Sequence, residues 1–136
     1  IAGLRVGYLL TNQTLAKLLY AIKPMYEVNS LGLLSAIILL DNPNINSQYI
    51  SDVKVGKELL INFLVKNNIN FINTFTNFIF INIESNVDNI VNVLNDHGII
   101  ISKGLPISGY EKYLRITIGP KKQIQRVITI LQKLIK

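Results

Sequence analysis

Cysteine is absent from the chain, and histidine occurs once, at position 97. Without cysteine there is no disulfide framework, no thiolate metal site and no cysteine nucleophile. A single histidine excludes zinc sites built from several histidines and argues against a Ser-His-Asp arrangement. We therefore predict no metal site. We expect His97 to lie at a helix end, where it interacts with terminal carbonyl groups.

Long hydrophobic runs are also missing, although 49% of the residues are hydrophobic and the mean hydropathy is +0.36. The longest run, LGLLSAIILL, covers residues 31–40 and is interrupted by Gly32 and Ser35. A membrane-spanning helix needs about 20 predominantly apolar residues. We therefore predict no membrane span.

Acidic residues are few, with eight Asp and Glu against fourteen Lys and Arg, for a net charge of +6. An excess of basic residues favours nucleic-acid binding when these residues are clustered. Here the basic residues are scattered, and the densest group is PKK at 120–122. The aromatic residues of an apolar stretch without lysine are expected in the core; they are Phe71, Phe75, Phe78 and Phe80. We predict no nucleic-acid partner and keep nucleic-acid binding only as a third alternative.

Arginine is scarce as well, since eleven of the basic residues are lysine and only Arg5, Arg115 and Arg126 are arginine. Lysine supplies a generic positive charge, whereas the planar guanidinium binds carboxylate or phosphate through two parallel hydrogen bonds. The three arginines are therefore the first candidates for an anion site.

The first part of the chain predicts one strand followed by two helices. We expect a strand over 2–10, a helix over 12–23 with Asn12 or Thr14 as its N-cap, and a helix over 30–41 capped by Ser30. The second helix is apolar on nearly all sides, so we expect it to be buried. A lone strand and two apolar helices indicate that a larger neighbour is missing.

The second part predicts a compact α+β sandwich, with helices on one face of a small, mainly antiparallel sheet. After the turn-rich segment NPNINSQ at 42–48, the expected order is helix, strand, strand, helix, strand, strand, helix. The expected ranges are 47–67, 69–72, 78–83, 85–98, 99–102, 113–119 and 120–136. We expect Ser85 or Asn86 to cap the middle helix and Gly98 to stop it.

Two arginines fall within expected strands, where side chains alternate between faces. In GLRVG, Gly3, Arg5 and Gly7 share one face, and the two glycines clear space around a cation that suits an anion such as phosphate. In LRITIG, Arg115, Thr117 and Gly119 share one face, with Leu114, Ile116 and Ile118 behind. The alternative for both arginines is an exposed strand edge or a pair with a nearby carboxylate.

Three segments together resemble the fold-type-I aminotransferases that use pyridoxal phosphate, in their histidinol-phosphate aminotransferase-like branch. These segments are AGLRVGYLLTN, KPMYEVNSLGLLSAIILLDN and YLRITIGPKKQIQRVITILQKL. The resemblance implies an α/β parent enzyme. Residues 1–46 would then be the last strand of its large domain and the interdomain helices, and residues 47–136 its small α+β domain.

The resemblance also implies site residues. Arg5 matches the arginine that holds the cofactor phosphate, and Arg115 matches the arginine that takes the substrate's carboxylate or contributes to an anion site. Lys103 lies where many members carry a second basic residue, often arginine. No catalytic residue is expected in this chain, because the Schiff-base lysine of the family lies in a segment expected upstream of Ile1.

The expected activity is amino transfer between a small-molecule amino donor, an amino acid or amino phosphate, and a 2-oxo acid acceptor. The resemblance implies pyridoxal 5′-phosphate as cofactor, a cytoplasmic location and a homodimer for the full-length protein. One alternative is a decarboxylase of amino-acid phosphates on the same scaffold. The other is a stand-alone α+β module that binds a ligand or partner without chemistry.

Overall fold

The computed structural model describes residues 2–83, 87–103 and 108–135, and the chain divides into two units, Ile1–Ser47 and Gln48–Lys136. The elements of the first unit are a 3₁₀ turn, η1 (Ala2–Leu4), and the helices α1 (Gln13–Ile22) and α2 (Ser30–Asp41). The long helix α3 (Pro43–Lys66) begins in the first unit and continues through the second. None of the described helices is both long and apolar enough to cross a membrane.

The strand expected over 2–10 is wrong. The chain forms η1, then a residue with a left-handed backbone at Arg5 (φ 57°), and continues to α1 without strand pairing. A strand needs a neighbour to satisfy its backbone N–H and C=O groups, and the described residues of this unit contain helices and turns only. The shared face inferred for Gly3, Arg5 and Gly7 therefore does not exist.

Both helices of the first unit begin at an asparagine. Asn12 caps α1 as predicted, because its side-chain oxygen accepts the Leu15 N–H at 2.9 Å. Helix α2 is capped by Asn29 and not by Ser30. The Asn29 Oδ1 accepts the Gly32 N–H at 2.7 Å, and its Nδ2 donates to the Leu4 carbonyl at 3.0 Å.

Helix α2 is not buried in this chain, contrary to expectation. Gly32 is its only buried residue, and the apolar side chains around it are exposed, as at Leu31 (64%) and Leu40 (65%). An apolar helix is buried only if another surface surrounds it, and no buried hydrophobic cluster lies among the described residues of this unit.

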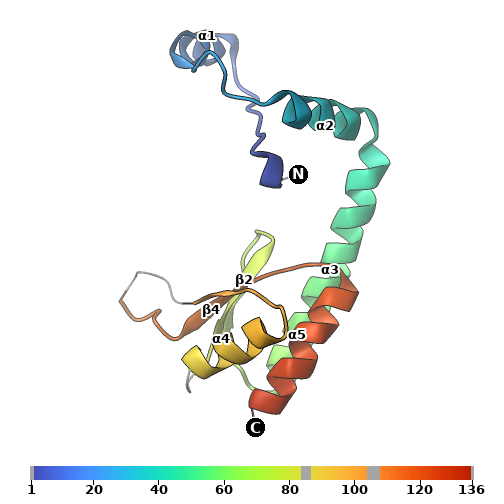
Figure 1. The fold of residues 1–136 in the computed structure, drawn as a ribbon, viewed down its shortest axis with the longest axis vertical. Helices are drawn as coiled ribbons and strands as arrows, with labels where there is room; N and C mark the ends of the chain where they lie inside the picture. The colour runs from blue at the N-terminus through green and yellow to red at the C-terminus, as the bar shows by residue number, and fades with distance from the viewer. Residues whose placement is uncertain (1, 84–86, 104–107, 136) are drawn as a thin grey trace. The chain divides into compact units, whose positions relative to one another are not determined.

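The second unit has the predicted order of elements (Figure 1). Within it, α3 is followed by β1 (Phe71–Ile72), β2 (Phe78–Asn82), α4 (Val87–Asp96), β3 (Ser102–Lys103), β4 (Tyr113–Thr117) and α5 (Lys121–Leu134). All neighbours in the sheet β1-β2-β4-β3 are antiparallel.

Two boundaries differ clearly from the expected ones. Helix α3 starts at Pro43, within the segment expected to be a turn-rich break, because proline fits the first position of a helix, where no N–H partner is needed. The strand expected over 99–102 is only Ser102–Lys103. The caps expected at Ser85 or Asn86 lie outside the described residues.

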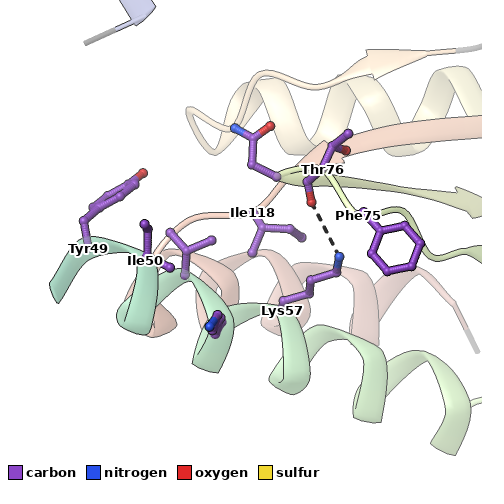
Figure 2. Close-up of a pocket in the computed structure, with 9 residues that line it drawn as sticks. Tyr49, Ile50, Lys57, Phe75, Thr76 and Ile118 are labelled. Atoms are coloured by element: carbon purple, nitrogen blue, oxygen red, sulfur yellow. Dashed lines mark hydrogen bonds between the residues drawn. The ribbon is translucent and has the colours of Figure 1, made fainter. Parts of the chain in front are cut away.

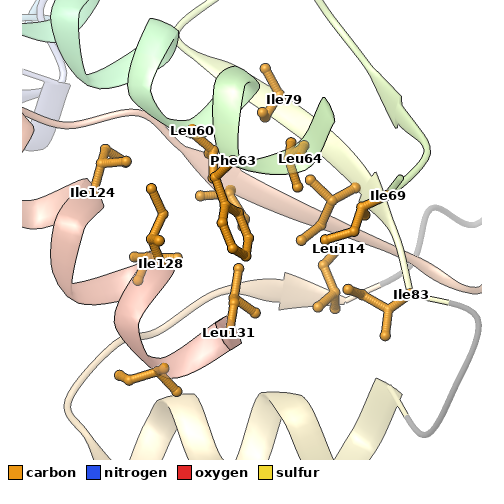
Figure 3. Packing of buried hydrophobic residues seen from close by; sticks show 14 of the residues in the cluster. Leu60, Phe63, Leu64, Ile69, Ile79, Ile83, Leu114, Ile124, Ile128 and Leu131 are labelled. Atoms are coloured by element: carbon orange, nitrogen blue, oxygen red, sulfur yellow. The ribbon is translucent and has the colours of Figure 1, made fainter. Parts of the chain in front are cut away.

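The core lies on one face of the sheet, beneath the helices (Figure 3). Alternation along β2 and β4 directs Ile79, Ile81, Leu114 and Ile116 to this face. Helices α3, α4 and α5 complete it with fully buried side chains, among them Leu60, Leu64, Leu94, Ile124 and Leu131. None of the described helices of the second unit covers the other face of the sheet, which we call the open face.

Geometry explains the choice of glycine at positions 56 and 98 of the second unit. Gly56 of α3 lies so close to the turn between β4 and α5 that a Cβ there would stand 2.2 Å from the Gly119 carbonyl oxygen. Gly98 (φ 71°) stops α4 as predicted. The N–H of Gly98 bonds the Asn95 carbonyl and that of Ile99 bonds the Leu94 carbonyl, both at 2.8 Å, which is the Schellman arrangement.

The histidine lies at the end of α4, where one of the three arginines contacts it from α5. His97 contacts the Val93 carbonyl through Nδ1 at 2.8 Å, which confirms its expected place at a helix end. Arg126 of α5 donates from Nη2 to the His97 carbonyl at 3.1 Å. Arg126 therefore has a structural role, in which it satisfies a terminal carbonyl and joins α5 to α4.

Candidate functional site

Arg5 is the candidate for the first unit. Its side chain is exposed, and it forms no ion pair with any residue that the structure describes. The flanking glycines, Gly3 and Gly7, have no other atoms within 4 Å of the positions where a Cβ would lie. An anion can therefore approach the guanidinium, although the glycines do not line a strand face as expected.

Arg115 is the candidate for the second unit, and it lies on the open face of β4. Thr117 shares this face and is exposed, while Leu114 and Ile116 are buried on the other, so the predicted alternation is confirmed within β4. Gly119, also expected on the face of Arg115, lies beyond the end of β4 and is buried against Gly56 of α3. Within the described part of the chain Arg115 has no carboxylate partner. The guanidinium is thus a cation without a counter-charge from the residues that the structure describes.

The neighbours of Arg115 come from the two adjacent strands. Its Cζ lies 5.5 Å from the centre of the Phe78 ring on β2, within the range of a cation–π contact. Its Nη2 lies 3.4 Å from the Ser102 Oγ on β3, a long hydrogen bond. Phe80 is the residue directly opposite Arg115 on β2, but the guanidinium lies over the diagonal Phe78 instead.

Lys103 lies on the opposite face of the sheet from Arg115. It pairs in register with Leu114, whose side chain is in the core, so both side chains leave the sheet toward the helices. Its Nζ contacts the Asp88 carboxylate on α4, and both side chains are more than half exposed. The structure therefore does not bring Lys103 and Arg115 together.

The prediction that the four phenylalanines of residues 71–80 lie in the core is wrong for three of them. Phe71 packs against the core as expected, but Phe78 and Phe80 are half-buried on the open face, and Phe75 is fully exposed. The signal was present in FIFIN, where Phe78 and Phe80 alternate with Ile79 and Ile81. Only one of these two sets can face the helices.

The loop that leads into β4 holds a carboxylate in a tight turn. Both carboxylate oxygens of Glu111 lie 3.0 Å from the Gly109 N–H, in a turn where Gly109 has a φ of 89°. Hydrogen bonds from the backbone N–H groups of Glu111 itself and of Gly109 lower the pKa of the Glu111 carboxyl below its usual 4.5. The carboxylate is charged at neutral pH and closes the turn beside Tyr113.

A cavity of about 420 Å³ lies between α3 and the β1–β2 loop (Figure 2). Apolar side chains of Tyr49, Ile50 and Ile118 line most of it. Lys57 at its rim donates to the carbonyl groups of Thr74 and of Thr76, the latter at 3.5 Å, and so fastens the loop to α3. The lining residues provide no nucleophile–base pair.

Acidic and histidine side chains do not cluster elsewhere: in residues 2–83, 87–103 and 108–135, no three of them are placed to hold a metal ion. The candidates for anion binding are therefore Arg5 in the first unit and Arg115 in the second.

A family model for aminotransferase class I and II matches residues 1–131. The chain belongs to this family. Among its relatives is histidinol-phosphate aminotransferase 1 of Idiomarina loihiensis, 29% identical over 136 residues that cover 98% of this chain and 36% of that protein. Histidinol-phosphate aminotransferase of Sulfurisphaera tokodaii is also 29% identical, and the match covers 100% of this chain and 36% of that protein. The chain thus spans little more than a third of the length of the curated relatives it matches.

Two solved structures have a similar fold. Histidinol-phosphate aminotransferase from Sinorhizobium meliloti, in complex with pyridoxal-5′-phosphate, superposes with a TM-score of 0.78 at 18% identity. The match covers 98% of this chain and 38% of that one. L-threonine-O-3-phosphate decarboxylase from Porphyromonas gingivalis superposes with a TM-score of 0.74 at 23% identity. That match covers 98% of this chain and 42% of the decarboxylase. The expected fold class and family resemblance are both confirmed.

Proposed function

We propose that this chain forms part of a pyridoxal-phosphate-dependent aminotransferase. The enzyme transfers an amino group between an amino acid or a histidinol-phosphate-like amino phosphate and a 2-oxo acid. Family membership and the names of the relatives support amino transfer. The observation that carries a role for this chain is Arg115, an exposed guanidinium on the open sheet face without a carboxylate partner among the described residues.

Arg115 is proposed to bind the anionic group of the substrate. A guanidinium presents N–H groups in a planar fork that matches a carboxylate or a phosphate. Because Arg115 has no acidic partner in the described chain, substrate binding does not require an existing ion pair to break. By contrast, Lys103 must leave Asp88 before it can bind another anion. Lys103 therefore stays a prediction as a second contact.

The residues of the first unit fit the phosphate end of pyridoxal phosphate. Arg5 is exposed, is free of acidic partners in the described chain and has open space beside it at Gly3 and Gly7. Arg5 would hold the phosphate by charge-assisted hydrogen bonds. When bound, the cofactor supplies an electron sink for bonds that break at the α-carbon of the substrate.

Two further features of the parent enzyme remain proposals that rest on the family resemblance. These are a homodimer as its working form and the cytoplasm as its location. The division of the chain into the end of a large domain, residues 1–46, and a small domain, residues 47–136, is proposed on the same ground.

The test is made on the protein that the gene encodes, mixed with pyridoxal phosphate, an amino donor such as histidinol phosphate, and a 2-oxo acid. The expected results are a visible absorption band that the amino donor changes, and formation of the amino acid that corresponds to the 2-oxo acid. Release of CO₂ from an amino-acid phosphate would instead support the decarboxylase, whose scaffold is the same. Absence of both the band and turnover would leave the stand-alone binding module.

A further inference from the structure

The guanidinium of Arg115 is held from both sides by residues of the neighbouring strands. The strand order β2-β4-β3 places Phe78 on one side of it and Ser102 on the other. Ser102 is directly opposite Arg115 in the register, whereas Phe78 is two residues along β2 from the opposite position. The side chain therefore leans along the sheet, toward the ring and across the open face.

The Phe78 ring is itself fixed in place. Its centre lies 5.4 Å from that of Phe80, with the ring planes at 75°, which is the favoured edge-on arrangement of two aromatic rings. Both rings are half-buried on the same strand and the same face. Phe80 thus supports Phe78, and Phe78 supports the cation.

We propose that Phe78 is a positioning residue that orders the Arg115 guanidinium for anion binding. This inference rests on the proposed role of Arg115 in binding the substrate's anionic group. A long, flexible arginine loses side-chain entropy when it binds an anion, and a ring that already restricts it lowers that loss. Ser102 accepts from one of the five N–H groups of the guanidinium, and the others remain available for a carboxylate or phosphate.

The chain offers a matched control, because Phe78 and Phe80 have the same side chain, strand, face and degree of burial, yet only Phe78 lies under the cation. In Phe78→Leu the apolar volume is nearly kept and the aromatic face is lost. In Phe80→Leu the same chemical change leaves the aromatic face of Phe78 under the guanidinium. A general loss of packing affects both variants alike, whereas a positioning role affects Phe78→Leu more.

The experiment is NMR of the Arg Nε–Hε groups in the whole chain, titrated with inorganic phosphate. With three arginines the spectrum is simple, and Arg115→Lys identifies the Arg115 signal by its loss. We expect the Phe78 ring to displace the chemical shift of the wild-type Arg115 signal from that of a free arginine. We also expect the guanidinium to rotate slowly. In Phe78→Leu the signal should move toward the position of a free arginine, and in Phe80→Leu it should move less. Phe78→Tyr keeps the ring face and should restore the wild-type signal.

Phosphate binding at Arg115 is expected to weaken about two- to fivefold in Phe78→Leu, the range of an exposed cation–π contact. An Arg115 signal with unchanged position and mobility in Phe78→Leu would overturn the inference. Equal changes in Phe78→Leu and Phe80→Leu would overturn it too, since they indicate packing alone. A displaced Arg115 signal that phosphate does not move would support the ordering by Phe78 and would overturn the proposed role of Arg115 in anion binding.

Discussion

Arg115 is an exposed cation on a strand whose other face is part of the core, and this placement separates its chemistry from the stability of the fold. The backbone of β4 is fixed by its register with β2 and β3 and by the burial of Leu114 and Ile116. Removing the guanidinium therefore should change binding without changing folding. This separation makes Arg115 suitable for mutation.

We predict that Arg115→Ala in the full enzyme lowers kcat/KM by about 30- to 1,000-fold, since a charge-assisted contact to substrate contributes roughly 2–4 kcal/mol. Steady-state kinetics measure the effect, and thermal unfolding should show little change. Arg115→Lys keeps the charge and loses the fork, so it should recover only part of the activity. Wild-type kinetics in Arg115→Ala would refute the assignment.

Glu111 is a residue whose contribution should depend on pH. Its folded-state pKa is lowered by backbone hydrogen bonds, so the charged form stabilises the turn at Gly109. That stabilisation is fully present above the ordinary pKa of 4.5 and is lost as the pH falls through the lower folded-state value.

We therefore predict that Glu111→Gln is less stable than wild type at pH 7 and that the difference disappears as the pH is lowered below 4.5. Thermal unfolding at a series of pH values measures this. Glu58→Gln is the control, because Glu58 is exposed on α3 and accepts no hydrogen bond from the described residues. A gap between wild type and Glu111→Gln that does not shrink as the pH falls below 4.5 would contradict the prediction.

At the scale of elements, the approach of α3 to the turn between β4 and α5 is decided by one glycine. A side chain at Gly56 would overlap the Gly119 carbonyl, which is backbone and cannot rotate away. This contact holds the long helix against the end of the strand that carries Arg115.

We predict that Gly56→Ala lowers the free energy of unfolding by about 1–3 kcal/mol, because overpacking exceeds the roughly 1 kcal/mol that alanine gains in a helix. Denaturant unfolding measures the change. Ser51→Ala, at an exposed position of the same helix, is the matched control and should be neutral or slightly stabilising. A Gly56→Ala protein as stable as wild type would show that α3 can move outward freely.

At the scale of the whole molecule, the two units differ in how they bury apolar surface. The buried cluster lies entirely between Leu60 and Leu131, within the second unit. In the first unit the apolar side chains of α1 and α2 are mostly exposed, including Leu18, Ile22 and Leu40. Exposed apolar surface of this extent is typical of a surface that further protein covers.

We predict that residues 48–136 alone unfold cooperatively, whereas residues 1–47 alone have no cooperative transition, since only the former have a core. Circular dichroism during heating tests both pieces. A dye that fluoresces on apolar surfaces should bind the whole chain more strongly than residues 48–136. Weak dye binding by the whole chain would mean that the exposed helices are covered.

Local pattern was enough to predict much of this protein. The β-branched and aromatic content of FIFIN predicted one central strand, and the alternation in YLRIT fitted the other. The period of apolar residues in 121–134 predicted the last helix, and the Gly98 stop followed from the residue type. The segments that carry Arg5 and Arg115 resembled one family closely enough to indicate it. These features depend on residues close in sequence.

Tertiary structure decided what depends on residues far apart. The strand expected around Arg5 did not form, because a strand exists only with a partner to share its hydrogen bonds. Pairing of β4 with β2 and β3 placed Phe78 and Ser102 beside Arg115, and the register with Leu114 sent Lys103 to the other face. Local sequence therefore determined the family and the order of elements in the second unit. Strand pairing determined which side chains meet, because register is set by contacts between distant segments.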